Sequence, residues 1–338
     1  MSWVLVSLAD QDQDVTNLVK PVDKTTDLKF QEPMTWSQEI FAVLVLSFFP
    51  GCLVWMPLLI TGSLLYTYLY PESWFLSLIP CFVLFALIWT PVSFQPELMH
   101  RFPKQSLYKY FSFKIVYEEQ LDRKTPMILI APPHGVFPFT NILNILCNEK
   151  IFGINFRGAT ATAALRAPVM RQVMAAIGCV NAGRKSLLKT LKHSSIGICP
   201  DGVAGIFTGR AQDETVYIAK RKGFVRIALK MGCPLVPVYQ FGNTQLWDLW
   251  YDDYGILASL SRKLGFGVLI VWGRWGTLVL KRTPLLSAVG KPIPVPKIEN
   301  PTEQDVDKYH KLFLEGLTNL FEKYKGNYGW SHKTLVIS

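Results

Sequence analysis

Two long stretches without a charged residue constrain this chain more than any other feature. The first covers residues 40–71 and the second, after Glu72, covers residues 73–96. About 20 apolar residues are enough to cross the hydrocarbon core of a bilayer. The pattern therefore predicts a membrane hairpin over residues 39–96.

The hairpin is expected to have apolar segments at about 40–70 and 73–94, joined by a tip at 70–73. Two buried core helices are the alternative, and several prolines also allow a kinked pair that enters one leaflet only. Basic side chains follow the second segment, so the positive-inside rule places residues 97–338 in the cytosol. The polar stretch 1–38 is then a cytosolic tail, expected to be poorly ordered.

Composition narrows the class of protein. Half of the 338 residues are hydrophobic, and the net charge is +10. A basic balance suits anionic lipid headgroups, a phosphate-rich substrate or nucleic acid, but no arginine-rich run or nucleic-acid motif is present, which argues against nucleic acid. The six cysteines are scattered without a C-x-x-C pair. They are typical of buried thiols in a reducing compartment, and no metal site is implied.

Beyond the hairpin, short apolar runs alternate with helix-like stretches. This alternation predicts an α/β fold with a mostly parallel sheet. The expected strands are 127–131, 152–156, 196–199, 235–239, 266–272 and 277–280. The expected helices are 139–147, 167–177, 216–231, 253–263 and an amphipathic one over about 306–324.

Two turns at strand ends carry the candidate chemistry. His134 and Gly135 follow the strand 127–131, and Asp201 and Gly202 follow the next but one. Carboxyl ends of parallel strands share one edge of a sheet, so His134 and Asp201 are expected to meet there. A carboxylate beside a histidine fixes its tautomer, and the imidazole can then remove a proton from a hydroxyl. A packed histidine and an ordinary Asp-Gly turn are the alternatives.

A basic segment is the candidate site for phosphate. Lys222, Arg226 and Lys230 recur every four residues and therefore share one helix face. This face is either solvated or binds the phosphates of coenzyme A or anionic lipids. The candidate binding residues are Arg221, Lys222, Gly223, Phe224 and Arg226, together with Arg274. Arg274 lies in a Gly-Arg-Trp-Gly turn for which structural packing is an equal alternative.

Taken in order, these segments resemble a known family. They are Pro133–Gly135, Arg221–Gly242, Gly273–Gly276 and Val289–Pro296, followed by Pro301-Thr302, Tyr309-His310 and Tyr324-Lys325. Over roughly residues 40–338 the chain is similar to the type-2 diacylglycerol acyltransferases, a group that also contains monoacylglycerol and wax-alcohol acyltransferases. The resemblance implies a glycerolipid-acyltransferase-like domain, with His134 as the active-site histidine.

The chain departs from the family pattern at two places. The usual His-Pro-His-Gly reads Pro132–Gly135, and the usual Gly-Gly-x-x-Glu reads Asp201–Gly205, so the acid stands at 201 instead of 205. Acyltransferases that use phosphorylated acceptors share two similar motifs. One has an Asp at the position of Phe139 in this chain, and the other has an Arg at the position of Ala204. Without that Arg, an uncharged acceptor is favoured.

The resemblance implies transfer of an acyl group from acyl-CoA to the hydroxyl of diacylglycerol, with His134 as general base. Backbone N–H groups near Gly135 or Gly202 would stabilise the oxyanion. No bound cofactor is expected, with acyl-CoA as co-substrate, diacylglycerol and membrane lipids as partners, and homo-oligomerisation left open. The expected location is the endoplasmic-reticulum membrane, extending to lipid droplets. Monoacylglycerol or fatty alcohol as acceptor, or a non-catalytic lipid-binding protein, are the alternatives.

Overall fold

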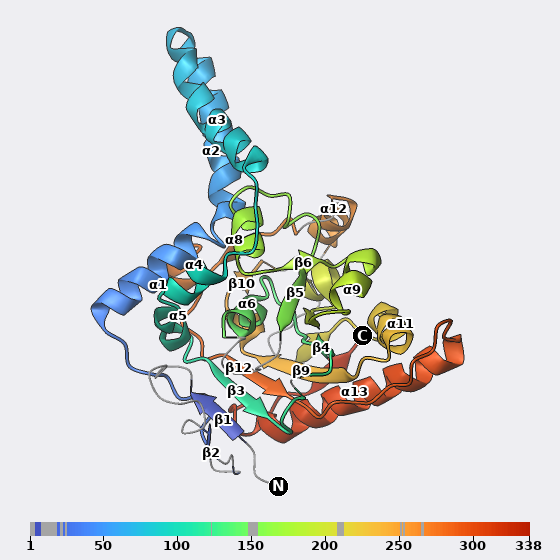
Figure 1. Ribbon diagram of the computed structural model, residues 1–338. Coiled ribbons are helices and arrows are strands. Elements are labelled where there is room, and N and C mark those ends of the chain that lie inside the picture. Colours follow the sequence, from blue (N-terminus) through green and yellow to red (C-terminus); the bar gives the residue numbers. More distant parts are fainter. Residues whose placement is uncertain are drawn as a thin grey trace.

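The computed structural model describes residues 4–7, 19–20, 23, 26–122, 124–147, 155–207, 213–250, 252, 254–264 and 267–338. Figure 1 shows an α/β body from which the helices α2 (Cys52–Leu69) and α3 (Leu78–Trp89) project side by side. A 3-10 turn, η2 (Pro71–Ser77), joins them at the predicted tip.

Both projecting segments, Cys52–Leu69 and Pro71–Trp89, are long and apolar enough to cross a membrane, and only 6% of either window is buried. A helix of 18 residues is about 27 Å long, close to the thickness of the hydrocarbon core. The exposure of these helices argues against the alternative of two buried core helices. The membrane hairpin itself stays a prediction, since length and composition are its support.

The first apolar run differs from the expected single segment. It is divided into α1 (Trp36–Phe48) and α2, with Pro50 and Gly51 between them. A side chain at Gly51 would come within 1.9 Å of the carbonyl oxygen of Ser47, so the close approach at this joint needs glycine. Helix α1 packs on the body through Ala42 and Leu46, and only α2 and α3 leave it.

Within the described residues, the body is built on one nine-stranded sheet. Its strands, in spatial order, are β2 (Val19–Lys20), β1 (Val4–Ser7), β3 (Lys114–Tyr117), β12 (Leu286–Val289), β9 (Leu235–Phe241), β4 (Ile128–Ile130), β7 (Ser195–Ile198), β5 (Phe156–Thr160) and β6 (Val180–Asn181). The block from β9 to β6 is parallel, as predicted. Strands β3 and β12 are parallel to each other but antiparallel to β9. Two small pairs, β10 (Asp248–Leu249) with β11 (Val271–Trp272) and β8 (Glu214–Val216) with β13 (Leu335–Ile337), lie outside this sheet.

Helices cover both faces of the sheet, and strand β4 shows why. Leu129 enters one apolar core, while Ile128 and Ile130 enter the other, because side chains alternate along a strand. The first core is covered by α1, α5 (Gln105–Tyr110), α6 (Phe139–Leu146) and α8 (Met170–Ala176). The second is covered by α9 (Arg184–Thr190), α11 (Gly223–Met231) and α13 (Glu303–Lys325). The shorter helices are α4 (Pro96–Arg101), α10 (Gly202–Ile206), α12 (Ile256–Leu264) and the 3-10 turns η3 (Asn243–Gln245) and η4 (Arg274–Gly276).

Most expected elements around the site are confirmed. Strands β4, β7 and β9 and helices α6 and α13 lie where the periodicity placed them. The expected helix 216–231 is wrong in its first half, where β8 ends at Val216 and a helix begins only at Gly223. Residues 277–280 form no strand, and the expected strand 152–156 falls largely outside the described residues, with β5 beginning at Phe156.

Candidate active site

Three neighbouring strands deliver the candidate site to one edge of the sheet. Strand β4 lies between β9 and β7 and runs parallel to both. The carboxyl end of β4 leads into the turn at His134, that of β9 leads to Asn243, and that of β7 leads to Asp201. The expected meeting of His134 and Asp201 is therefore observed, with Asn243 as a third member.

Asp201 holds the backbone of His134 rather than its ring. The main-chain N–H of His134 donates to Oδ2 of Asp201 at 2.7 Å. The carboxylate is fully buried, and a charge-assisted hydrogen bond in such a place contributes about 1.5–3 kcal/mol. The expected carboxylate–imidazole contact is wrong for this geometry, because Asp201 fixes where the turn lies and leaves the ring to another partner.

That partner is the carbonyl of the next residue. Nδ1 of His134 lies 2.9 Å from the main-chain oxygen of Gly135. A carbonyl oxygen can only accept, so Nδ1 carries a proton, and in the neutral ring the lone pair is therefore on Nε2. Among the described residues Nε2 has no hydrogen-bond partner, and the side chain of His134 is only half-buried. The ring is thus held in the tautomer that a general base needs.

Asn243 is the functional residue that sequence reasoning missed. Its amide Nδ2 donates to the carbonyls of His134, Pro133 and Phe137 at 2.7, 3.2 and 3.3 Å. Its Oδ1 accepts from the N–H and hydroxyl of Thr140 at 3.1 and 2.9 Å. Asn243 therefore closes the turn from the side opposite Asp201. The rule that paired His134 with Asp201, a polar residue after a parallel strand, also applies to Asn243 and could have found it.

The turn also depends on glycine at position 135. Gly135 has φ of +58°, and a side chain there would come within 2.9 Å of the Asn243 carbonyl oxygen. Because of the positive φ and the close contact, any other residue at position 135 would be strained. Within the described part of the chain, the N–H groups of Gly135 and Gly202 donate to no protein acceptor. They remain available to an oxyanion, whereas the N–H of His134 is occupied by Asp201.

Gly205 explains why the acid can stand at 201. A Cβ atom at position 205 would lie 2.7 Å from Oδ2 and 2.9 Å from Cβ of Asp201. The carboxylate therefore occupies the space that a side chain at 205 would need. An acid at 201 and an acid at 205 exclude each other in this turn.

Cys199 brings a thiol into this network. Its thiol donates to Oδ1 of Asp201 at 3.1 Å. Burial, reinforced by the Asp201 charge, holds the pKa of this thiol well above its usual value. A thiol that stays protonated is a poor nucleophile, so this environment does not favour Cys199 as a nucleophile.

The floor beneath the turn is apolar and touches the base of the projecting helices. Phe139 is buried against Phe111 and Phe137. The ring of Phe137 packs edge-on against Phe49, with centroids 5.7 Å apart. Phe49 caps α1 just before α2 begins. The candidate base therefore lies beside the point where the hairpin leaves the body.

The basic segment is mostly paired within the protein. Nζ of Lys222 lies 2.5 Å from Asp307, and Arg226 binds both carboxylate oxygens of Glu303 at 2.5 and 2.6 Å. Both acids belong to α13 and both pairs are partly exposed, so this helix face is partly solvated and is not an open site for phosphates. Phe224 is buried against Phe313, which gives it a packing role.

Arg221 and Gly223 are the exposed members of the basic segment. Arg221 stacks over the ring of Tyr217 at 5.4 Å, and Gly223 opens helix α11 without a side-chain cap. Arg274 lies elsewhere. It pairs with Glu39 of α1 at 2.5 Å and stacks on Trp275 at 4.1 Å, so it joins the Gly-Arg-Trp-Gly turn to the base of the hairpin.

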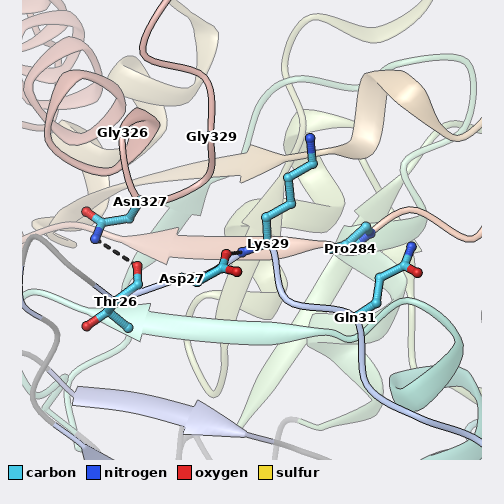
Figure 2. A pocket seen from close by; sticks show the side chains of 8 residues that line it. All are labelled: Thr26, Asp27, Lys29, Gln31, Pro284, Gly326, Asn327 and Gly329. Carbon is cyan, nitrogen blue, oxygen red and sulfur yellow. Dashed lines mark hydrogen bonds between the residues drawn. The ribbon is translucent and has the colours of Figure 1, made fainter.

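A hollow of about 480 Å³ lies away from these residues. Figure 2 shows its walls, in which the segment 26–31 faces Pro284 and the turn that follows α13, around Asn327. Asn327 donates to the Thr26 carbonyl at 3.0 Å across its edge. None of His134, Asp201 and Asn243 lines the hollow, so the candidate active site lies outside it.

Comparison with known proteins decides the family. A family model described as diacylglycerol acyltransferase matches residues 67–338. The chain belongs to the diacylglycerol acyltransferase family. It is 31% identical to human acyl-CoA wax alcohol acyltransferase 1 over 66% of this chain and 73% of that protein. It is 30% identical to human diacylglycerol O-acyltransferase 2 over 65% and 62% of the two chains.

A member of this family is an acyltransferase of lipid metabolism. The solved structure of the 1-acyl-sn-glycerophosphate acyltransferase PlsC from Thermotoga maritima is also similar, with a TM-score of 0.41 and 16% identity, covering 84% of this chain and 98% of that one. The relatives' names carry two different acceptors, a diacylglycerol and a wax alcohol. Membership therefore gives the reaction class and leaves the acceptor to be argued.

The contacts of Asp201 generate a specific prediction. Asp201→Asn keeps an oxygen for the His134 N–H, so turnover should stay within a few-fold of the unchanged enzyme. Asp201→Ala leaves that buried N–H without an acceptor, which costs about 1–3 kcal/mol, and should lower turnover roughly 10–100-fold. Steady-state kcat of the purified full chain, with thermal unfolding alongside, measures both. A large loss of turnover in Asp201→Asn would contradict this interpretation and would support a carboxylate–imidazole dyad instead.

The exclusion between positions 201 and 205 supplies the control. Gly205→Glu alone should be strongly impaired, because its side chain meets the Asp201 carboxylate. The double variant Asp201→Gly, Gly205→Glu moves the acid to the position usual in the family and should recover activity relative to either single change. A double variant as poor as the worse single one would contradict the shared-space interpretation.

Proposed function

We propose that this acyltransferase transfers a fatty acyl group from acyl-CoA to the free hydroxyl of diacylglycerol, forming triacylglycerol and CoA. The single observation that carries the mechanism is the contact between Nδ1 of His134 and the Gly135 carbonyl at 2.9 Å. It leaves Nε2 as a proton acceptor at a half-buried position beside the hairpin. A base in that place suits a substrate hydroxyl that arrives from the lipid phase.

The reaction then follows in two steps. Nε2 of His134 removes the proton from the acceptor hydroxyl while its oxygen attacks the thioester carbonyl, and the tetrahedral oxyanion is held by the N–H groups of Gly135 and Gly202. The intermediate collapses with cleavage of the carbon–sulfur bond. The leaving thiolate takes the proton from the imidazolium, which restores the base and completes the balance of atoms and charge.

The surroundings of the turn support an uncharged acceptor. Phe139 and Phe137 are buried apolar rings beside His134, and the ring of Phe49 extends this surface to the base of the hairpin. No arginine stands at position 204 to pair with an acceptor phosphate. With the hairpin in the bilayer, diacylglycerol reaches the site without leaving the lipid. We place the enzyme in the endoplasmic-reticulum membrane and on lipid droplets, with its body in the cytosol.

A long-chain alcohol is the second candidate acceptor. The 31% identity to acyl-CoA wax alcohol acyltransferase 1 favours it, and its hydroxyl would present the same chemistry to His134. Monoacylglycerol is equally uncharged. The apolar site suits each of these acceptors, so a competition assay between them identifies the preferred one.

The base and the acceptor can be tested in one assay. Purified full chain receives labelled acyl-CoA with diacylglycerol, monoacylglycerol and a long-chain alcohol together, and triacylglycerol should be the main product. His134→Gln should lower turnover about 10²–10⁴-fold, because loss of a general base costs that much. The exposed His193→Gln is the matched control and should be unaffected. Full activity in His134→Gln would reject the base, whereas wax ester as the main product would change only the acceptor.

For the phosphates of acyl-CoA, we propose Arg221 together with the uncapped N-terminus of α11 at Gly223. Lys222 and Arg226 are already neutralised by Asp307 and Glu303, so they are left out of this role. Backbone N–H groups at a helix N-terminus and an exposed guanidinium suit an anionic group.

The difference between the two arginines is measurable. Arg221→Glu should raise the KM for acyl-CoA several-fold with little change in kcat. Arg226→Gln breaks an exposed ion pair worth about 0–1 kcal/mol and should leave that KM unchanged. Equal effects of the two changes on the KM for acyl-CoA would contradict this assignment.

A further inference from the structure

Large apolar side chains are exposed in a pattern that the hairpin alone does not explain. Outside the two projecting helices, most of the exposed ones in the described residues fall in three segments. They are Trp36, Ile40, Leu44 and Phe48 of α1, Phe94 and Leu98 just after α3, and Trp250, Tyr254, Ile256, Leu260, Ile270, Trp272 and Trp275 around α12 and β11. Apart from Tyr70, Trp74, Phe75 and Leu76 at the hairpin tip, only Phe30, Leu312 and Val336 lie elsewhere among the described residues.

Helix α1 has two apolar faces, and the body uses one of them. Ala42 and Leu46 are buried on the body, while the four exposed side chains recur every four residues along the other face. Trp36 is 85% exposed at the start of that stripe. A helix in water does not keep such a stripe uncovered, so something apolar is expected to cover it.

The three segments gather around the base of the hairpin. Figure 1 shows α1 crossing that base at a steep angle to α2, with α4 and α8 beside it and α12 on the other side of the projecting pair. The Gly-Arg-Trp-Gly turn is tied to α1 by the ion pair between Arg274 and Glu39. On the far side, Arg171 donates to the carbonyls of Ile88 and Thr90 at 2.8 and 2.7 Å and so fixes the end of α3 to α8.

We infer that these segments form a membrane-seating face, made of the exposed residues of α1, 94–98, 250–260 and 270–275, which lies on the bilayer surface around the hairpin. The inference rests on the proposed membrane hairpin. If α2 and α3 cross the bilayer, α1 lies along its surface with the exposed stripe turned to the lipid. The body is then held by a broad contact as well as by two helices, and the turn at His134 is kept at the interface.

Lipid fits this face better than a second copy of the chain. The face is continuous along the chain with α2 and α3, which carry no charged residue and expose large apolar side chains. It surrounds the projecting helices, which would prevent a flat partner from reaching all three segments. Its tryptophans, Trp36, Trp250, Trp272 and Trp275, are the residues that favour the boundary between water and lipid. The charge of Glu39 is already neutralised by Arg274.

Photolabelling of the full chain in phospholipid vesicles tests this face directly. The vesicles contain a phosphatidylcholine with a diazirine in its acyl chain, and adducts are mapped by mass spectrometry after irradiation. Adducts are expected in α1 and in 270–276 as well as in α2 and α3. Leu312 and Val336, exposed apolar side chains outside the face, are internal controls and should carry none.

Adducts confined to α2 and α3, adducts nowhere, or equal labelling of Leu312 and Val336 would each overturn the inference. Cross-links between the α1 helices of two copies, without lipid adducts there, would overturn it in favour of a dimer. Acyltransferase activity is measured in the same vesicles. Retained His134-dependent activity with α1 unlabelled would reject only the seating face, whereas labelled α1 with no acyl transfer would reject only the proposed function.

A variant gives a second, functional readout. The double change Ile40→Ser, Leu44→Ser alters only exposed side chains of the stripe and keeps the Glu39–Arg274 pair. It should reduce labelling of α1 and lower turnover of vesicle-borne diacylglycerol several-fold, with activity toward detergent-dispersed substrate unchanged. Leu312→Ser is the matched control and should change neither. An equal loss in vesicles and detergent would show damage to the fold and contradict the membrane role.

Discussion

The candidate site depends on one buried carboxylate. Asp201 is fully enclosed, yet it accepts hydrogen bonds from the His134 N–H and the Cys199 thiol, and it fills the space left by glycine at 205. Burying a charge is costly unless it is well paired, so this carboxylate fixes the turn after β4 to the end of β7. The ring position, the free lone pair and the available N–H groups all follow from where that turn is held.

The residues around His134 have different roles from those in a carboxylate–histidine dyad. In a dyad one acid both orients the imidazole and stabilises its charged form. Here the Gly135 carbonyl selects the tautomer, Asp201 anchors the backbone, and Asn243 closes the turn through three carbonyls. No acid among the residues that the structure describes contacts the ring, and position 139 is a buried phenylalanine. In the proposed mechanism, deprotonation of a neutral acceptor hydroxyl in this apolar setting rests on the imidazole and on the backbone N–H groups around it.

Sequence reasoning reached the parts of the site that follow from periodicity and topology. It placed β4, β7 and β9, and the rule for parallel strand ends brought Asp201 to His134. It could not give the partner of Nδ1, because that is a main-chain oxygen and every residue has one. It assigned phosphate binding to Lys222 and Arg226, since a helical face does not reveal that Asp307 and Glu303 of a distant helix cover it. Sequence reasoning also assigned most of α1 to the hairpin, because apolar residues that face lipid and apolar residues that face a core look alike in a sequence.

The tautomer of His134 tests the central claim most directly. Nitrogen-15 NMR of the full chain with labelled histidine, assigned by loss of a signal in His134→Gln, distinguishes a protonated Nδ1 from a protonated Nε2 at neutral pH. The account predicts Nδ1–H with an unprotonated Nε2, and the same tautomer in Asp201→Asn. A neutral ring protonated at Nε2, or a tautomer that changes in Asp201→Asn, would contradict it.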